Sequence, residues 1–192
     1  MFADFALYAG WTANSSDRFV NDNLAPPLGE DHALANFNSW FLAPELRVGM
    51  DIETDSEWTL TPSATARFSN QWVDGYTETG SNANATVGAR IVQVFEGELE
   101  LAATRKIETT EVTVRGGLDY RQAIGGATQD VTLLGQNLAL PMNTSGAFGA
   151  YVGLDANHKF SDNLSLDLSA KAGYTAGGSI NISGSIGVSG LF

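Results

Sequence analysis

The stretch 180–192, Ile-Asn-Ile-Ser-Gly-Ser-Ile-Gly-Val-Ser-Gly-Leu-Phe, decides the fold class of this chain. Its even positions carry apolar groups or glycine, and its odd positions are mostly asparagine, serine and glycine. A period of two is typical of a β-strand with one apolar and one polar face. The stretch ends on the apolar side chain of Phe192, whereas soluble domains usually fray into polar residues. We therefore expect this strand to end at a membrane boundary.

Similar alternation recurs in nine earlier segments, which lie at 5–13, 40–52, 58–68, 87–91, 95–107, 112–124, 131–139, 148–160 and 164–176. Polar connections rich in glycine, proline or asparagine separate some of them, at 14–39, 70–84 and 141–146. The 21 glycines and the mean hydropathy of -0.07 also favour strands over helices. The sequence therefore predicts an all-β chain with about ten strands.

The polar faces of these segments carry a balanced set of charges. The acids and bases are Glu45, Arg47, Asp51, Arg67, Arg90, Glu98, Glu100, Arg115, Asp119, Arg121, Asp155, Lys159, Asp167 and Lys171. An enclosed lumen requires such pairing, because an unpaired buried charge is costly. These side chains could contact a segment threaded through the lumen, or they could pair among themselves as a plug.

Aromatic residues on the apolar faces gather near the strand ends. They are Trp11, Trp40, Trp58, Phe68, Tyr120, Phe148, Phe160 and Tyr174. Aromatic girdles of this kind flank the lipid-facing band of transmembrane barrels. The segments also reach about 10–13 residues, near the ~9–11 needed to cross a bilayer. We therefore predict an antiparallel up-and-down transmembrane β-barrel, although alternation alone would also suit a soluble β-sandwich.

Composition excludes several classes of function. The formal net charge of -12 argues against nucleic-acid binding, and the absence of cysteine excludes disulfides and cysteine-based metal sites. No residue pattern calls for a cofactor or a metal centre. The first residues lack the basic and apolar regions of a secretory signal, so we expect an exported protein to be represented here by a fragment or a mature segment.

The orientation follows from placing Phe192 at the periplasmic side. Counting back, the connections 53–57, 92–94, 125–129 and 161–163 become periplasmic. The long connections 14–39, 70–84 and 141–146 become extracellular, together with the short ones at 108–111 and 177–179. The contrast between short turns and long loops expected of such barrels is therefore clear only in the N-terminal half.

Four stretches resemble the C-terminal translocator β-domain of autotransporters. They are Leu-Thr-Pro-Ser-Ala at 60–64, Asp-Gly-Tyr-Thr-Glu-Thr-Gly at 74–80, Ser-Asp-Asn-Leu-Ser-Leu at 161–166 and the terminal Phe192. The similarity runs over nearly the whole chain, and the loop from Gly75 to Gly80 is its most specific part. That loop could fold toward the pore mouth, although a glycine-rich turn is a sufficient account of its individual residues.

The resemblance implies a bacterial outer-membrane barrel of the type V secretion system, in contact with outer-membrane lipid and lipopolysaccharide. It implies twelve strands and an N-terminal passenger in cis, joined by a linker helix that threads the pore. With ten strands counted, we expect residues 1–192 to be one N-terminally truncated barrel domain that lacks the passenger, linker helix and first strands.

The resemblance also implies recognition by the barrel-assembly machinery through the terminal strand, by edge pairing. The residues concerned are Phe192, Val188, Ile186 and Ile182, which also suit simple lipid contact. Gly190 stands where the family more often has a bulky apolar residue, and this weakens the signal.

The leading hypothesis is a non-enzymatic translocator that anchors and helps export a passenger. A small barrel that acts as an adhesin or a passive pore is the alternative. A barrel protease or lipase would need a base such as His158 or His32. We expect His158 to lie at the membrane interface and His32 to lie in a solvated acidic loop, so neither is assigned a catalytic or metal-binding role.

Overall fold

The computed structural model describes residues 1–22, 29–126, 128–142 and 144–190. The described part contains thirteen β-strands. Within these ranges, no helix has the length and apolar character needed to span a membrane. The all-β prediction is confirmed.

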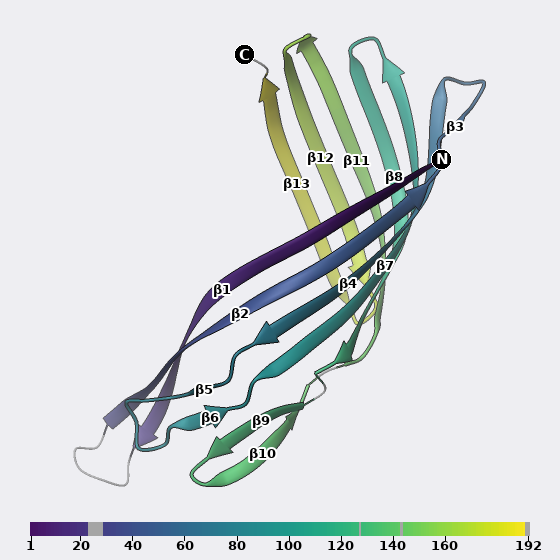
Figure 1. Ribbon diagram of the computed structural model, residues 1–192. Helices are drawn as coiled ribbons and strands as arrows, with labels where there is room; N and C mark the ends of the chain where they lie inside the picture. The colour runs from purple at the N-terminus through teal and green to yellow at the C-terminus, as the bar shows by residue number, and fades with distance from the viewer. Residues whose placement is uncertain (23–28, 127, 143, 191–192) are drawn as a thin grey trace.

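Eight long strands form one antiparallel meander in which sequential strands are neighbours. They are β1 (Phe2–Asp22), β2 (Gly29–Gly49), β4 (Trp58–Val73), β7 (Arg90–Ile107), β8 (Thr110–Gly125), β11 (Ala147–Ser161), β12 (Leu164–Thr175) and β13 (Ser179–Gly190). The short β3 (Ile52–Glu53) pairs with β4. Figure 1 shows that the sheet curls, with β1 and β13 as its two edges.

The register sorts side chains onto two faces. Glu45 pairs with Arg67 on one face, and the next residues, Leu46 and Ala66, pair on the other. Charged and polar groups lie on the inner, concave face, and the apolar phase lies on the outer face. Large apolar side chains of the outer face are exposed, up to 82% for Ile182. Because the described residues provide no second layer to cover this face, the soluble-sandwich alternative is wrong.

The predicted loop 14–39 is wrong, because most of it belongs to β1 and β2. These two strands pair without interruption from Phe2 opposite Gly49 to Asp22 opposite Gly29. Beyond Trp11 the outer face carries polar residues such as Ser15 and Asp17. The alternation of apolar and polar residues is therefore lost in this part of β1 and β2, although the backbone pairing continues.

The predicted turn at 92–94 is also wrong. Strand β7 runs through it, with Val92 opposite Gln71 and Val94 opposite Ser69. The predicted strand 131–139 is instead a hairpin of β9 (Thr128–Leu133) and β10 (Gln136–Pro141), which turns at Leu134 and Gly135. Both turn residues have positive φ values, 49° and 74°. The meander of the described part therefore has eight strands instead of ten.

These two corrections change the end of the sheet to which some connections are assigned. Residues 50–57, 108–109 and 162–163 connect strands at the end that holds Phe2 and Gly190. The links between β1 and β2, β4 and β7, β8 and β11, and β12 and β13 lie at the opposite end. The connections 108–111 and 125–129 were thus assigned to the wrong ends. The contrast between short turns and long connections now extends to the connection between β8 and β11, whereas the connection 176–178 between β12 and β13 is short.

A four-stranded sheet continues the wall at the end with long connections (Figure 1). Its order is β10-β9-β6-β5, with β5 (Tyr76–Thr77) and β6 (Ala85–Val87). An isolated bridge connects β2 to the segment after β5, because the amide and carbonyl of Leu34 both bond to Thr79 at 2.8 Å. The wall of the molecule therefore projects well beyond the ends of β12 and β13.

Candidate functional site: the charged inner face

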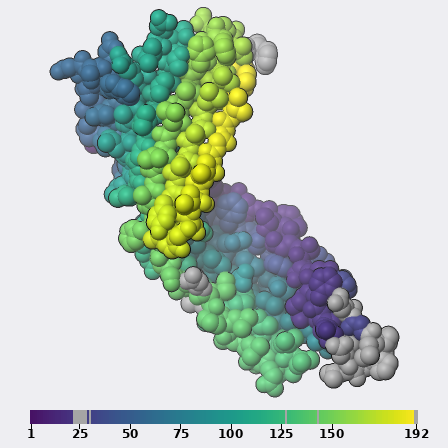
Figure 2. Space-filling view, turned by 180° about the vertical axis from the view of Figure 1, so that it is seen from behind, coloured from purple at the N-terminus to yellow at the C-terminus, as the bar shows by residue number. Residues whose placement is uncertain are grey.

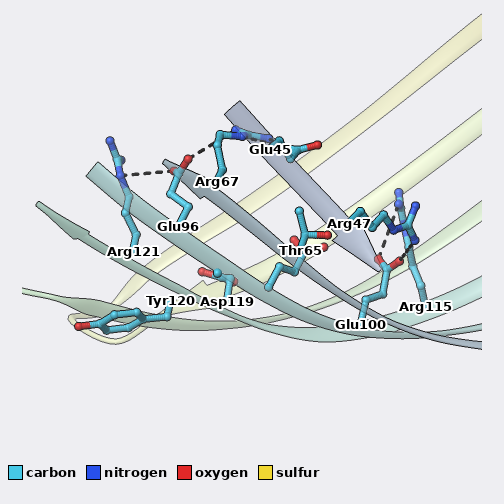
Figure 3. Close-up of a pocket in the computed structure, with 12 residues that line it drawn as sticks. Glu45, Arg47, Thr65, Arg67, Glu96, Glu100, Arg115, Asp119, Tyr120 and Arg121 are labelled. Atoms are coloured by element: carbon cyan, nitrogen blue, oxygen red, sulfur yellow. Dashed lines mark hydrogen bonds and ion pairs between the residues drawn. The ribbon is translucent and has the colours of Figure 1, made fainter. Parts of the chain in front are cut away.

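A row of alternating charges crosses four strands of the inner face. The register aligns Glu45 of β2, Arg67 of β4, Glu96 of β7 and Arg121 of β8. The guanidinium of Arg67 lies 2.5 Å from Glu45 and 3.5 Å from Glu96, and Arg121 lies 3.5 Å from the other oxygen of Glu96 (Figure 3). Opposite charges on neighbouring strands thus neutralise each other across the sheet.

Glu100 is the centre of a second cluster, four residues beyond Glu96 on β7. Its carboxylate lies 3.2 Å from Arg47 and 4.0 Å from Arg115, and it accepts a 2.7 Å hydrogen bond from the Tyr151 hydroxyl. Arg115 also donates to Asp155 at 3.1 Å. The Glu100 side chain is only 8% exposed. Its negative charge is therefore stabilised by several donors at once.

Glycines on the inner face make room for these side chains. A Cβ on Gly117 would lie 2.7 Å from the Tyr151 ring and from the Leu99 carbonyl oxygen. The Tyr151 ring is nearly buried, and the ammonium of Lys171 lies 3.5 Å from its centroid. The Tyr151 ring therefore packs against Gly117, and its hydroxyl donates to Glu100.

The structure gathers many of the predicted lumen charges around one polar groove. Its lining includes Glu45, Arg47, Arg67, Glu98, Glu100, Arg115, Asp119 and Arg121. Glu98 and Asp119 also line a second inner-face pocket with Lys171. Asp155 and Asp167 lie on the same face, nearer the end of the sheet that holds Gly190. There Asn157 donates to Asp167 at 2.6 Å.

Three predicted lumen charges lie at the margins of this face. Asp51 accepts a 2.7 Å hydrogen bond from Thr61, and Lys159 pairs in register with Ser165. At the other end, Arg90 donates to Gln129 of β9. These residues do not join the central rows.

Sequence reasoning missed Glu96 and Tyr151. Glu96 lies beside the turn that was wrongly predicted at 92–94, so it was left out of the charged face. For Tyr151, a signal was present in Gly117, which occupies an inner-face position of β8 directly against the ring. Glycine on the polar phase of neighbouring strands is thus a useful marker of an inward aromatic residue.

Aromatic residues form a descending line on the outer face. Trp11, Trp40 and Trp72 pair in one row across β1, β2 and β4, with the rings of Trp40 and Trp72 stacked at 4.2 Å. The later members lie progressively nearer the other end, first Phe68, then Tyr120 and Phe148, and then Tyr174. Such a stagger is expected when tilted strands meet a flat boundary. Trp72 was missed because it lies in the predicted loop 70–84.

A second aromatic line marks the opposite boundary. The Trp58 ring lies 6.0 Å from the Arg105 guanidinium, and Phe160 contacts His158 edge-on at 4.7 Å. On β11 the two lines are marked by Phe148 and Phe160. At ~3.3 Å per residue and a tilt of roughly 40°, these twelve residues span about 30 Å. The apolar band thus has the thickness of a bilayer core.

Comparison with known families decides the identity of this fold. A family model described as the autotransporter beta-domain matches residues 1–171. The chain belongs to the autotransporter β-domain family. No curated protein matches the chain. This autotransporter β-domain is an outer-membrane β-barrel wall, so its outer face contacts lipid and its inner face lines the lumen.

The terminal strand of this β-domain presents its apolar phase to lipid. Ile182, Ile186 and Val188 all lie on the outer face of β13 and are strongly exposed. Phe192 lies outside the described residues. Gly190 pairs with Leu164 at the last register position of β12 and β13.

The two histidines lie in different settings. His158 shares a 2.8 Å hydrogen bond with Thr110 at the second aromatic line, which contains Trp58 and Phe160. His32 lies on β2 beyond the first aromatic line, which contains Trp40. Its Nδ1 atom lies 2.9 Å from Asp17. His32 was predicted in a loop, and its place on a strand is a correction. In the described ranges no group of three or more His, Cys, Asp or Glu side chains could hold a metal ion.

The loop from Gly75 to Gly80 is fastened to the extended part of β1 and β2. Arg18 lies 2.5 Å from Glu78 and also donates to the Ala83 carbonyl at 2.7 Å. A second Glu78 contact is the 2.8 Å hydrogen bond from the Ala85 amide. The ion pair lowers the pKa of Glu78 below its ordinary 4.5 and raises the pKa of Arg18. This loop is thus a structural clamp outside the apolar band.

We expect Glu78→Gln to loosen this clamp by about 2–4 kcal/mol, because it leaves Arg18 without its buried partner. In the unaltered protein the contribution of Glu78 is fully present above the unfolded pKa. It is lost only as the pH falls through the lowered folded pKa, so the clamp should hold at pH 5. Hydrogen exchange at the Thr79 and Ala85 amides measures this. Similar exchange rates in Glu78→Gln and the parent at pH 7 would contradict it.

Proposed function

We propose that this outer-membrane β-domain anchors an N-terminal passenger of the same polypeptide and provides the hydrated route by which it reaches the cell surface. The observation that carries the proposal is the charged inner face, in a chain that belongs to a translocator family. The domain acts without catalysis, by holding water and polar side chains along a path through the bilayer.

The pairing of the charges favours passage of a polypeptide over tight binding of one. Glu96 is bridged between Arg67 and Arg121, and Glu100 lies between Arg47 and Arg115. Since each of these carboxylates is already neutralised, it holds a passing polypeptide weakly. The wall still offers polar groups that replace water around an unfolded chain. Such a surface favours passage of many sequences and binds none of them tightly.

The open edges support a larger barrel than the described meander. Strands β1 and β13 end the sheet, and open sheet edges do not occur in the hydrocarbon region of a bilayer. We therefore propose that residues 1–192 form the C-terminal part of one barrel domain. Further strands of the same protein then lie between β1 and β13, and a linker helix joins the barrel to the passenger.

Two further partners follow from this assignment. The outer aromatic lines contact lipid and lipopolysaccharide at the two interfaces. The barrel-assembly machinery captures the β13 edge, with Ile182, Ile186, Val188 and the terminal Phe192 as its recognition residues. The strong exposure of the described members of this set supports both contacts.

The test uses the full-length protein in outer membranes, with the passenger followed by protease added outside the cell. The unaltered protein should display its passenger, and its protease-protected barrel should be longer than the 192 residues of this chain. In the variant Ile186→Ser/Val188→Ser, barrel insertion and display should fall together in cells, whereas refolding in detergent should change little.

A matched control is the variant Ser183→Ala/Ser185→Ala, which alters two inner-face positions of the same strand. It should assemble and display normally. Assembled barrels with no passenger at the surface would overturn the proposed function and favour an adhesin or passive pore. Equal losses in cells and in detergent would remove the recognition role and leave lipid contact alone.

A further inference from the structure

Two basic side chains interrupt the apolar outer face at the second aromatic line. The register of the described strands turns every carboxylate between the two aromatic lines toward the inner face. Arg105 of β7 and His158 of β11 instead belong to the outward phase, because Arg105 pairs in one row with Trp58 and His158 pairs with Thr110. The lipid-facing surface of the described strands is therefore basic at this line and carries no acid between the lines.

These two basic residues lie at nearly one depth in the membrane. Thr110 pairs with both Ile107 and His158, so His158 is two strands away from Arg105 and two residues nearer the short turns. The second aromatic line descends across the sheet in the same direction and by a similar step. At ~4.8 Å between strands and ~3.3 Å per residue, the two Cα atoms are about 12 Å apart. Two long side chains that rise from the sheet at this spacing can both donate to a single phosphate group.

The Arg105 guanidinium is only partly satisfied by its neighbours. It donates to Glu57 at 3.0 Å and lies 6.0 Å from the centre of the Trp58 ring. Because the Glu57 side chain is 76% exposed, this pair is weak. The Nε atom of Arg105 is buried and has no hydrogen-bond partner among the described residues. A guanidinium has five N–H donors, so this one can bind a further anion.

The His158 ring is held in place by contacts on two sides. Its Nδ1 atom shares the 2.8 Å hydrogen bond with Thr110, and its ring contacts Phe160 edge-on. The residue is half-buried on the outer face. Its second nitrogen, Nε2, is thus the atom through which this fixed ring can bind a ligand at the membrane surface.

Acidic residues lie in the short turns beside this basic pair. Figure 2 shows the blue turn 50–57 and the teal turn 108–109 at the same end of the wall. They contain Glu57 and Glu108, both exposed. An anion that arrives from water meets these carboxylates first, whereas a lipid head group reaches Arg105 and His158 from the membrane side. The arrangement therefore favours an anion that is anchored in the bilayer.

We propose that Arg105 and His158 together bind the phosphate of an anionic glycerophospholipid. The phosphodiester accepts charge-assisted hydrogen bonds from the guanidinium and from the imidazole. Its acyl chains lie against Val114 and Leu154, which pair with each other one row further into the membrane and are 49% and 51% exposed. Trp58 and Phe160 flank the head group at the interface.

This inference goes beyond passenger transport, and its choice of lipid rests on the orientation with the short turns at the periplasmic side. That leaflet contains glycerophospholipid, whereas lipopolysaccharide occupies the opposite one. A lipid that binds the folded wall and not the unfolded chain stabilises the folded wall. Glu57 competes with the phosphate for the same guanidinium, so it limits the affinity of the site.

The first test measures the affinity of the detergent-solubilised full-length protein for a fluorescent phosphatidylglycerol. We expect Arg105→Gln to weaken binding about tenfold and His158→Gln about threefold, because each removes a charge-assisted donor. Glu57→Gln should tighten binding about threefold, since it removes the competing carboxylate. Lys106→Gln is the matched control, because Lys106 is the next residue on β7 and pairs with Glu111 on the inner face. It should bind like the parent.

Heat-modifiable gel mobility verifies that each variant is folded. Arg105→Lys, which keeps the charge, is a second variant and should weaken binding only about threefold. Unlabelled phosphatidylglycerol should compete at least about fivefold better than phosphatidylcholine, whose ammonium offsets its phosphate. Equal competition by glycerol phosphate would show an adventitious anion site only, and stronger competition by lipid A would show the wrong lipid class. Either result, or equal losses in Arg105→Gln and Lys106→Gln, would overturn the proposal.

The second test identifies the lipid in outer membranes, with a photoreactive phenylalanine analogue at position 112 or 113 of the full-length protein. Position 112 faces outward in the row of Arg105, and Thr113 bonds to Thr104 on the inner face at 2.8 Å. Glycerophospholipid adducts are expected at position 112, and at least about fivefold fewer at position 113. Lipid A adducts at position 112, or equal yields at both positions, would contradict the assignment. Neither readout uses passenger display, so a failure of the proposed translocation is recognised separately.

Discussion

The Glu100→Gln variant is expected to be about 3 kcal/mol less stable than the parent barrel. The change removes the negative charge between Arg47 and Arg115 and leaves two cations facing each other on the inner face. Removing one partner of a buried ion pair typically costs about 3–5 kcal/mol. Because the Arg47 side chain is 40% exposed, we expect the lower end of this range. Urea unfolding of the full-length protein in phospholipid vesicles measures the difference.

Glu57→Gln is the matched control for this prediction. Glu57 also pairs with an arginine, at 3.0 Å from Arg105, but its side chain is 76% exposed in a turn. Surface pairs contribute at most about 1 kcal/mol, so this variant should unfold close to the parent. Similar midpoints for Glu100→Gln and Glu57→Gln would show that the inner-face network is fully solvated and adds nothing to stability.

The Leu99→Arg variant is expected to lose about 2–4 kcal/mol, because it places a cation on the lipid side near the bilayer midplane. Leu99 pairs with Ala64 and Leu118, about halfway between the two aromatic lines. Its side chain is exposed on the outer face. Reversible unfolding from vesicles, measured by tryptophan fluorescence, reports the loss directly.

Ile107→Arg supplies the depth control on the same strand and the same face. Ile107 pairs with Thr110 at the short turn, beyond the row that contains Trp58 and Arg105. An arginine there reaches the interface, and the expected loss is only about 0–1 kcal/mol. A larger loss at Ile107 than at Leu99 would contradict the membrane position derived from the aromatic lines.

Local sequence patterns predicted the two faces correctly wherever lipid touches the wall. In β11 and β12 the alternation from Phe148 to Phe160 and from Leu164 to Tyr174 matches the observed outer face. The reason is physical, because each strand must present apolar groups to hydrocarbon at every second position. The same constraint allowed the hairpin of β2 and β4 to be predicted from the sequence, despite Pro44 and Pro62.

The constraint disappears outside the bilayer, and the prediction failed there. The outer face of β1 becomes polar beyond the membrane, so a paired strand was taken for a loop. At Val92 and Val94 the inner face carries apolar groups, so the phase was misread and a turn was inserted. Glu96 was lost from the charged cluster for the same reason. Backbone pairing with neighbouring strands, which the sequence does not display, kept these segments extended.

The sequence by itself determined that this protein is an antiparallel β wall with an apolar outside and a charged inside, because side-chain alternation is a local property of each strand. Only the tertiary structure decided which segments are continuous and at which end each turn lies. It also decided that Glu100 joins Arg47 to Arg115. These features depend on register between strands distant in the chain, and register is fixed by the packing of the whole sheet.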